Sequence, residues 1–142
     1  MAKLNSVALN PESSVEGIWV TYMYDIELKI ARLGNSKYKE YAAKLLAPFV
    51  RESRGKVLPD ERLEKVTKPA VANCILVDWR NIQNDDGTEF EYSPEKALEI
   101  LSDDKYVDLY EFVMLTSGNS EIFRAELQED SAGNLEKSSS GN

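Results

Sequence analysis

The run EGIWVTYMYDIELKIARL, residues 16–33, decides how this chain begins to fold. Its first half is rich in aromatic and β-branched residues and alternates between two apolar faces, which favours a strand. After Asp25, the apolar Ile26, Leu28 and Ile30 alternate with mostly polar residues, which predicts a second strand with one buried face. We therefore expect a β-hairpin that turns near Tyr24 and Asp25, although one continuous bent strand fits the same alternation.

Helical spacing follows this strand pair. Asn35 or Ser36 can cap a first helix, which Pro48 should kink or end. Its apolar stripe consists of Tyr38, Tyr41, Ala42, Leu45, Leu46, Phe49 and Val50. A second helical stretch starts near residue 59 and runs through Cys74 and Ile75, and its spacing extends to Trp79 and Ile82. Because Pro69 interrupts this stretch, either one helix or two helices fit it.

The last third of the chain reads as a turn followed by short helices. Residues 84–87, NDDG, predict the turn, and residues 89–92 predict no more than an extended edge. Ser93 followed by Pro94 predicts a helix start, and residues 102–104 predict the cap of another helix with Tyr106 on its buried stripe. A final helix is expected from Ser120 to about Gln128.

The expected fold class is therefore α+β and mostly α, with an N-terminal hairpin (or bent strand) packed on a bundle of about four to six short helices. Residues 1–15 are assigned to a flexible N-terminal segment and residues 16–129 to a single globular domain. Residues 130–142 are rich in serine, glycine and asparagine, which predicts a disordered tail.

The composition is that of an ordinary globular domain. The chain has 142 residues, of which 42% are hydrophobic and 30% charged. No run approaches the roughly 18 consecutive apolar residues that a membrane span needs. The first ten residues lack the apolar core of a signal peptide, and the single cysteine, Cys74, cannot build a disulfide framework. We expect a cytosolic protein with no membrane partner.

The net charge of −8 is distributed unevenly. Residues 26–68 carry eleven basic against six acidic side chains, whereas residues 81–130 carry three against fourteen. The two halves could neutralise each other across an internal surface, they could be two solvated faces, or the acidic half could face a basic partner. Nucleic acid is not an expected partner because an acidic surface repels phosphates, although the acidic half could mimic nucleic acid.

The residues that most catalytic sites require are missing. The chain contains no histidine and one cysteine, which excludes histidine-dependent zinc sites and catalytic triads. Its seven glycines form no phosphate-binding loop. The segment around Gly87 is not a calcium loop, because Ile82 and Ser93 stand where acidic ligands are needed. A paired-carboxylate glycosidase site among the clustered acids has little room in a chain of this size. We expect no enzyme, no metal and no cofactor.

The aromatic first strand supplies the first candidate binding residues. Both of its faces are apolar, whereas a hairpin on a helical core has only one face to bury. Some of its large side chains should therefore be exposed or covered by a partner. The candidate partner-binding residues from the strand and from the following helix are Trp19, Tyr22, Tyr24, Tyr38, Tyr41 and Leu45.

Several short motifs follow one another in order along the chain. They are Ile30-Ala31-Arg32-Leu33-Gly34-Asn35, Val77-Asp78-Trp79, Asp86-Gly87, Tyr92-Ser93-Pro94-Glu95-Lys96-Ala97-Leu98, Asp108-Leu109-Tyr110-Glu111-Phe112-Val113 and Phe123-Arg124. In this order and spacing, residues 16–128 resemble the tail assembly chaperones of long-tailed (siphovirus-type) bacteriophages.

The resemblance implies a protein that holds the helical tape-measure protein soluble in the host cytoplasm before the tail tube polymerises, and that is absent from the mature virion. Docking of an amphipathic helix in a groove is the matching binding mode. Self-association is a further expectation for its partners. Two other functions remain open: an acidic nucleic-acid-mimic inhibitor (an anti-defence protein) and a structural tail component.

Overall fold

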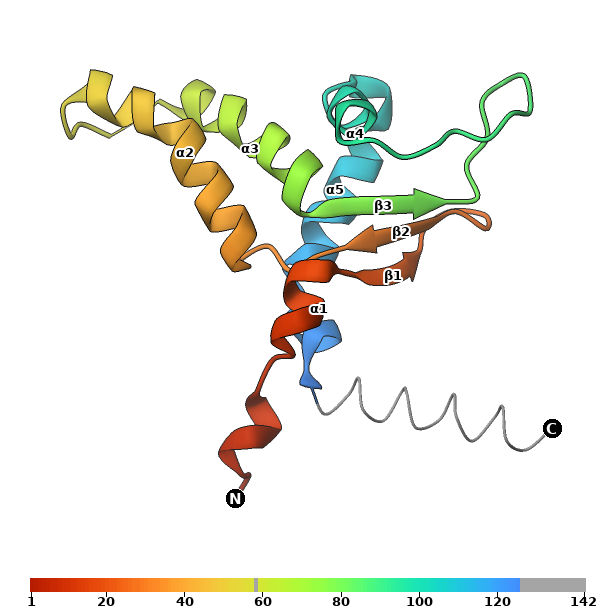
Figure 1. Ribbon diagram of the computed structural model, residues 1–142, viewed down its shortest axis with the longest axis horizontal. Helices are drawn as coiled ribbons and strands as arrows, with labels where there is room; N and C mark the ends of the chain where they lie inside the picture. Colours follow the sequence, from red (N-terminus) through yellow and green to blue (C-terminus); the bar gives the residue numbers. More distant parts are fainter. Residues whose placement is uncertain (58, 126–142) are drawn as a thin grey trace.

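The computed structural model describes residues 1–57 and 59–125 and shows the expected α+β fold (Figure 1). Within these residues, the elements in chain order are η1 (Leu4–Val7), α1 (Pro11–Glu16), β1 (Ile18–Thr21), β2 (Glu27–Ile30), α2 (Ser36–Ser53), α3 (Asp60–Cys74), β3 (Leu76–Arg80), α4 (Pro94–Leu101), η2 (Asp104–Tyr106), α5 (Val107–Ser117) and η3 (Ser120–Phe123), where η marks a 3-10 helix. The final helix expected from Ser120 to about Gln128 is wrong as far as the structure describes it: the 3-10 helix η3 ends at Phe123, and Arg124 is extended and forms a bridge with Leu9. The rest of that prediction, from residue 126, and the tail predicted for residues 130–142 lie outside the described residues.

The predicted hairpin is confirmed. β1 pairs with β2 in antiparallel register, with Val20 opposite Leu28. The Tyr22 amide donates a hydrogen bond to the Ile26 carbonyl at 2.8 Å, which closes the turn. The chain reverses through Tyr24, whose φ of 56° is left-handed. A positive φ is uncommon for a residue other than glycine, and this turn also lacks the usual Asn-Gly sequence.

The third strand, β3, corrects the sequence analysis. The second helical stretch was expected to continue towards Trp79, but α3 ends at Cys74 and residues 76–80 pair with β2. The register between β2 and β3 shifts next to Lys29, so that Leu76 and Trp79 are both buried although they are three residues apart. Because of this bulge, the buried residues of β3 have a spacing in the sequence that is also typical of a helix. Pro69, in contrast, lies inside one continuous helix.

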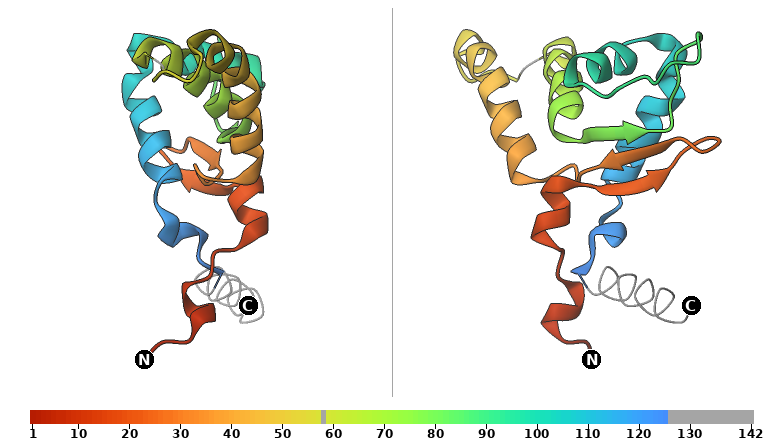
Figure 2. Two further views of the ribbon diagram at one scale, coloured as in Figure 1. Left: turned by 90° about the vertical axis from the view of Figure 1, so that its left-hand side faces the viewer. Right: turned by 45° about the vertical axis from the view of Figure 1, so that its right-hand side comes forward.

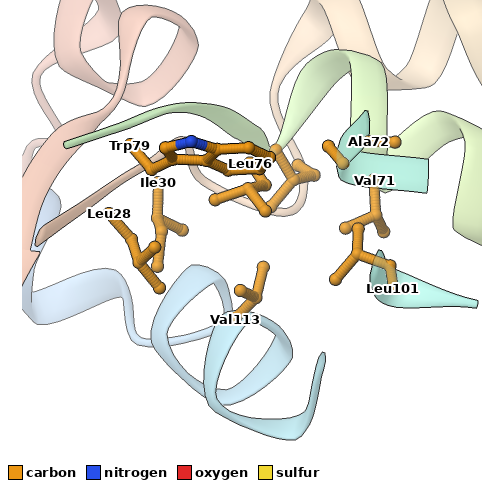
Figure 3. Close-up of a cluster of buried hydrophobic side chains, with 10 residues drawn as sticks. Leu28, Ile30, Val71, Ala72, Leu76, Trp79, Leu101 and Val113 are labelled. Carbon is orange, nitrogen blue, oxygen red and sulfur yellow. The ribbon is translucent and has the colours of Figure 1, made fainter. Parts of the chain in front are cut away.

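The core lies between one face of the sheet and the helices. Figure 3 shows Val113 of α5 facing Leu28 and Ile30 of β2, with Leu76 and Trp79 of β3 beside them. The other buried members of this cluster come mainly from α3 and α4; they are Val71, Ala72, Ile75, Ala97 and Leu101. The hairpin therefore packs on the helices through one face only, as its alternation predicts.

α2 begins as predicted but is less buried than the other long helix. The Asn35 side chain accepts a hydrogen bond from the Tyr38 amide at 2.9 Å, which caps α2. The helix passes through Pro48 and ends at Ser53, and it contains no fully buried residue. Figures 1 and 2 show α2 and α3 as an arm at one end of the sheet, whereas the hairpin tip and the loop after β3 project at the other end.

The N-terminal segment contains a helix that the sequence analysis did not predict. α1 is capped by Asn10, whose side chain accepts hydrogen bonds from Glu12 and Ser13. The Asn10 amide donates to the Phe123 carbonyl at 2.8 Å, and Leu9 forms a bridge with Arg124. Residues of the segment assigned as flexible thus pair with the last described part of the chain.

Ionisation of Tyr92 at high pH should lower the stability of the fold. Burial, and then the charges of Asp78, Cys74 and Glu95, raise the pKa of Tyr92 to about 12. Its hydroxyl donates to the Leu76 carbonyl at 2.6 Å. An unfolded tyrosine loses its proton near pH 10. The contribution of Tyr92 to stability is therefore complete below about pH 10 and is lost as the pH rises towards about 12.

We expect Tyr92→Phe to be less stable than the wild type at neutral pH, because it removes the hydrogen bond from the hydroxyl to the Leu76 carbonyl. The difference in free energy of unfolding should narrow between about pH 10 and 12, since only the wild type loses the tyrosine contribution. Denaturant unfolding of both proteins across this range measures it. A difference that stays constant would contradict the pKa shift.

Candidate functional site

A groove opens at the end of the molecule where the hairpin tip lies. It has a volume of about 640 Å³ and is bounded by the hairpin turn, the loop after β3, the end of α4 and the start of α5. We call it the hairpin groove. The apolar side chains that line it are Tyr22, Met23, Tyr24, Ile26, Leu28, Trp79, Ile82, Phe90, Ile100, Tyr106 and Leu109. Its volume falls in the range of about 300–1,000 Å³ that is usual for ligand pockets.

The loop after β3 forms one wall of the hairpin groove, and the indole of Trp79 holds this loop in place. Its Nε1–H donates to the Phe90 carbonyl at 2.7 Å, and its ring stacks on the Phe90 ring at a centroid distance of 5.3 Å. The Tyr92 ring meets the indole edge-on at 4.9 Å. The Phe90 amide in turn donates to the Ile82 carbonyl at 2.9 Å. The long connection between β3 and α4 is therefore held by specific bonds.

The tip of this loop is a hydrogen-bonded turn, as predicted. The Gly87 amide donates to the Asn84 carbonyl at 2.9 Å. The Thr88 hydroxyl and amide both donate to the Asp86 carboxylate, and these bonds lower the pKa of Asp86. In the described residues, no group of three or more acidic or cysteine side chains is arranged to hold a metal ion.

Large apolar side chains stand exposed at the mouth of the hairpin groove. Tyr24 is 94% exposed, Met23 is 52% exposed and Tyr106 is 43% exposed. Tyr22 lies deeper, with its ring centroid 4.8 Å from that of Phe112. Burial, and then the negative charge of Asp108, raise the pKa of Tyr22. The mouth thus combines aromatic rings and a flexible thioether, which are common at protein-binding surfaces.

The charged side chains of the hairpin groove are mostly acidic. Asp85 comes from the loop, and Glu99, Asp103 and Asp108 come from the corner between α4 and α5. The one cation of the lining, Lys105, lies 3.7 Å from the Asp103 carboxylate. We call Asp85, Glu99 and Asp108 the acidic rim. No ion pair among residues 1–57 and 59–125 involves any of the three.

Two of the six candidate residues line the hairpin groove, namely Tyr22 and Tyr24. Trp19 does not, because its side chain lies on the opposite face of the sheet. There the Arg80 guanidinium is 4.1 Å from the centroid of its ring, and Lys29 approaches to 6.0 Å. The structure therefore divides the predicted aromatic patch between the two faces of the sheet.

The other three candidates lie on α2 and are half-buried. Tyr38 packs against the core cluster, and burial is the main cause that raises its pKa. The Tyr41 hydroxyl accepts a hydrogen bond from the Asn73 side chain of α3 at 3.0 Å. Neither these tyrosines nor Leu45 lines the hairpin groove.

The wall of the hairpin groove opposite the hairpin is not predicted by the sequence. The alternation around Phe90 predicts only an extended edge, and helical spacing places Tyr106 on a buried stripe, whereas Tyr106 is exposed at the mouth. The sequence signal for this wall is the alternation around Phe90 next to a predicted turn. Nothing in the sequence indicates that this turn lies near the hairpin. Their proximity depends on β3, which was predicted as helix.

The ion pairs of residues 1–57 and 59–125 do not compensate the uneven charge of the two regions. Among the described residues, the ion pairs are Arg62–Glu52, Arg80–Glu27, Lys105–Asp103 and Arg124–Glu121. None of them joins the basic region 26–68 to the acidic region from 81 onward. Of the three interpretations of the charge, these pairs do not support mutual neutralisation.

No helix in residues 1–57 and 59–125 has the length and apolar character to cross a bilayer. Comparison with curated proteins and with solved structures gave no significant match. The sequence profile of the family described as YdaY prophage protein matches residues 33–134, which is well over half of the chain. This match indicates a phage-derived protein. The chain belongs to the YdaY prophage protein family.

Proposed function

We propose that this phage-derived protein is a tail assembly chaperone that holds the tape-measure protein soluble in the host cytoplasm before the tail tube polymerises. It acts by binding a polypeptide and carries out no catalysis, and it needs neither metal nor cofactor. It leaves the client during assembly and is absent from the mature virion.

One observation carries the proposal: the hairpin groove presents apolar side chains that residues 1–57 and 59–125 leave exposed. Tyr24, at 94% exposed, costs solvation free energy unless another molecule buries it. A tape-measure protein exposes amphipathic helices before assembly, and apolar grooves bind such helices. The net charge of −8 favours solubility of the loaded complex.

The acidic side chains support this function over a nucleic-acid mimic. A mimic needs carboxylates in a continuous array that replaces the phosphates of a duplex. Here the three carboxylates of the acidic rim line the hairpin groove among mostly apolar side chains, which suits a polypeptide better than a nucleic-acid-binding surface. The structural tail component remains the competing function for a phage protein, and particle composition separates it from a chaperone.

The test is co-expression with the tape-measure protein of the same phage. Met23→Ser with Tyr24→Asn removes two exposed side chains, and asparagine tolerates the positive φ of position 24. We expect the wild type to bring the tape-measure protein into the soluble fraction and the double variant to reduce that fraction roughly tenfold, the loss expected for removal of two exposed apolar anchors.

The matched control is Val50→Ser with Val57→Ser, which removes exposed apolar side chains at the arm formed by α2 and α3. This control should keep the wild-type effect. The proposal fails if the wild type leaves the tape-measure protein insoluble. Recovery of the protein from purified phage particles would assign it to the tail structure.

A further inference from the structure

We propose that the hairpin groove selects a basic amphipathic helix, that is, a helical segment whose apolar stripe is flanked by lysine or arginine. This inference rests on the proposed function and states which part of a client the site recognises. It follows from three properties of the groove: its apolar lining, the hydrogen bonds within its walls and the negative charge of its rim.

The lining is built to receive an apolar stripe. Ile26 comes from the hairpin, and Ile100 and Leu109 come from the two helices opposite, whereas Leu28 and Trp79 of the sheet are buried beneath them. These side chains project from separate elements towards one space. A helix that inserts residues at successive turns can contact all of these elements at once.

The backbone around the hairpin groove favours a helix over an extended peptide. An extended peptide gains affinity by pairing with free amides and carbonyls at a sheet edge. In the hairpin turn, Tyr22 donates to Ile26 and Ile26 donates to Met23. In the facing loop, Phe90 donates to Ile82. These bonds occupy backbone groups in both walls, and a helix brings a backbone that is already satisfied.

The acidic rim favours a partner segment with positive charge. The carboxylates of Asp85, Glu99 and Asp108 have no ion-pair partner in the described residues, and Lys105 is paired with Asp103. A bound apolar helix would displace water from around these carboxylates. Lysine or arginine beside the stripe would compensate for that loss, whereas glutamate would repel the rim.

The experiment uses two fluorescent peptides of about 18 residues, or roughly five helical turns, with the same leucine stripe. One peptide has lysine on both flanks and the other has glutamate. Anisotropy titrations with the full-length protein should show the lysine peptide binding at least tenfold more tightly, as expected for several exposed charge pairs. Added salt should weaken this preference.

The triple variant Asp85→Asn, Glu99→Gln, Asp108→Asn neutralises the acidic rim and leaves the apolar lining intact. We expect it to bind the lysine peptide about tenfold more weakly than the wild type. The control variant Glu40→Gln, Glu91→Gln, Glu111→Gln removes the same charge from exposed residues outside the hairpin groove. It should remain within about twofold of the wild type.

Three results would overturn the inference. Equal binding of both peptides would show that apolar contact alone decides, and equal losses in the two variants would assign the preference to net charge. A dimer that the rim variant abolishes would assign the hairpin groove to a second copy of the chain. In each case, wild-type solubilisation of the tape-measure protein would still support the proposed function, so the two failures are distinguishable.

Discussion

Replacing Trp79 with alanine is expected to lower the free energy of unfolding by about 3–5 kcal/mol, the cost of removing a large aromatic side chain from a core. Trp79 is only 5% exposed and lies in the core cluster between β2 and the groove wall. The substitution removes its stacking on Phe90, its edge contact with Tyr92 and the hydrogen bond from its Nε1. Urea unfolding followed by circular dichroism measures the change.

The chain contains its own control, because it has two tryptophans. Trp19 lies half-buried on the other face of the sheet and is held mainly by Arg80. Trp19→Ala should cost about 1 kcal/mol, which is typical of a partly exposed residue with a cation–π contact. Equal losses at the two positions would contradict the assignment of Trp79 to the core.

A second variant separates the two roles of the Trp79 indole. Trp79→Phe keeps an aromatic ring but leaves the Phe90 carbonyl without its donor. We expect an intermediate cost of about 1–3 kcal/mol, which is the penalty for leaving a partly buried acceptor without its donor. A loss as large as that of alanine would mean that the hydrogen bond, and not the ring packing, dominates.

The sequence predicted the local elements better than their long-range pairing. Alternation around Leu28 and Ile30 predicted the hairpin, and capping signals at Asn35 and Ser93 predicted where α2 and α4 begin. These signals act within a few residues, so they can be read from one chain. The pair Asn10-Pro11 carries a similar signal for α1 that the sequence analysis did not use.

The third strand could not be read in the same way. A bulge places Leu76 and Trp79 on one face of β3, and this spacing of three is also that of a helix. Only the edge of β2, almost fifty residues earlier in the chain, decides between the two. The error carried over to the site, because β3 brings the loop with Phe90 beside the hairpin. Tyr22 and Tyr24 were therefore predicted without the opposite wall.

Gly17→Ala is expected to cost about 3 kcal/mol or more, because it combines backbone strain with a steric clash. Gly17 follows α1 with φ 95° and ψ 166°, a region that side chains rarely adopt. A Cβ atom would lie 3.0 Å from Cγ2 of Val77 and 3.2 Å from the backbone carbon of Ile30. The backbone of β2 cannot move away without disturbing Ile30, which is fully buried.

Gly87→Ala is the control that separates the cost of backbone strain from the cost of a steric clash. Gly87 has φ 87°, but a Cβ atom there would meet nothing within 4 Å. Its replacement should cost only about 1 kcal/mol, the lower end for a strained backbone position. Adding Val77→Ala to Gly17→Ala should recover part of the loss, since it removes the nearer contact but leaves the Ile30 backbone in place. If both glycine variants lose the same stability, backbone conformation alone explains Gly17, and the close approach of α1 to the sheet contributes nothing to the fold.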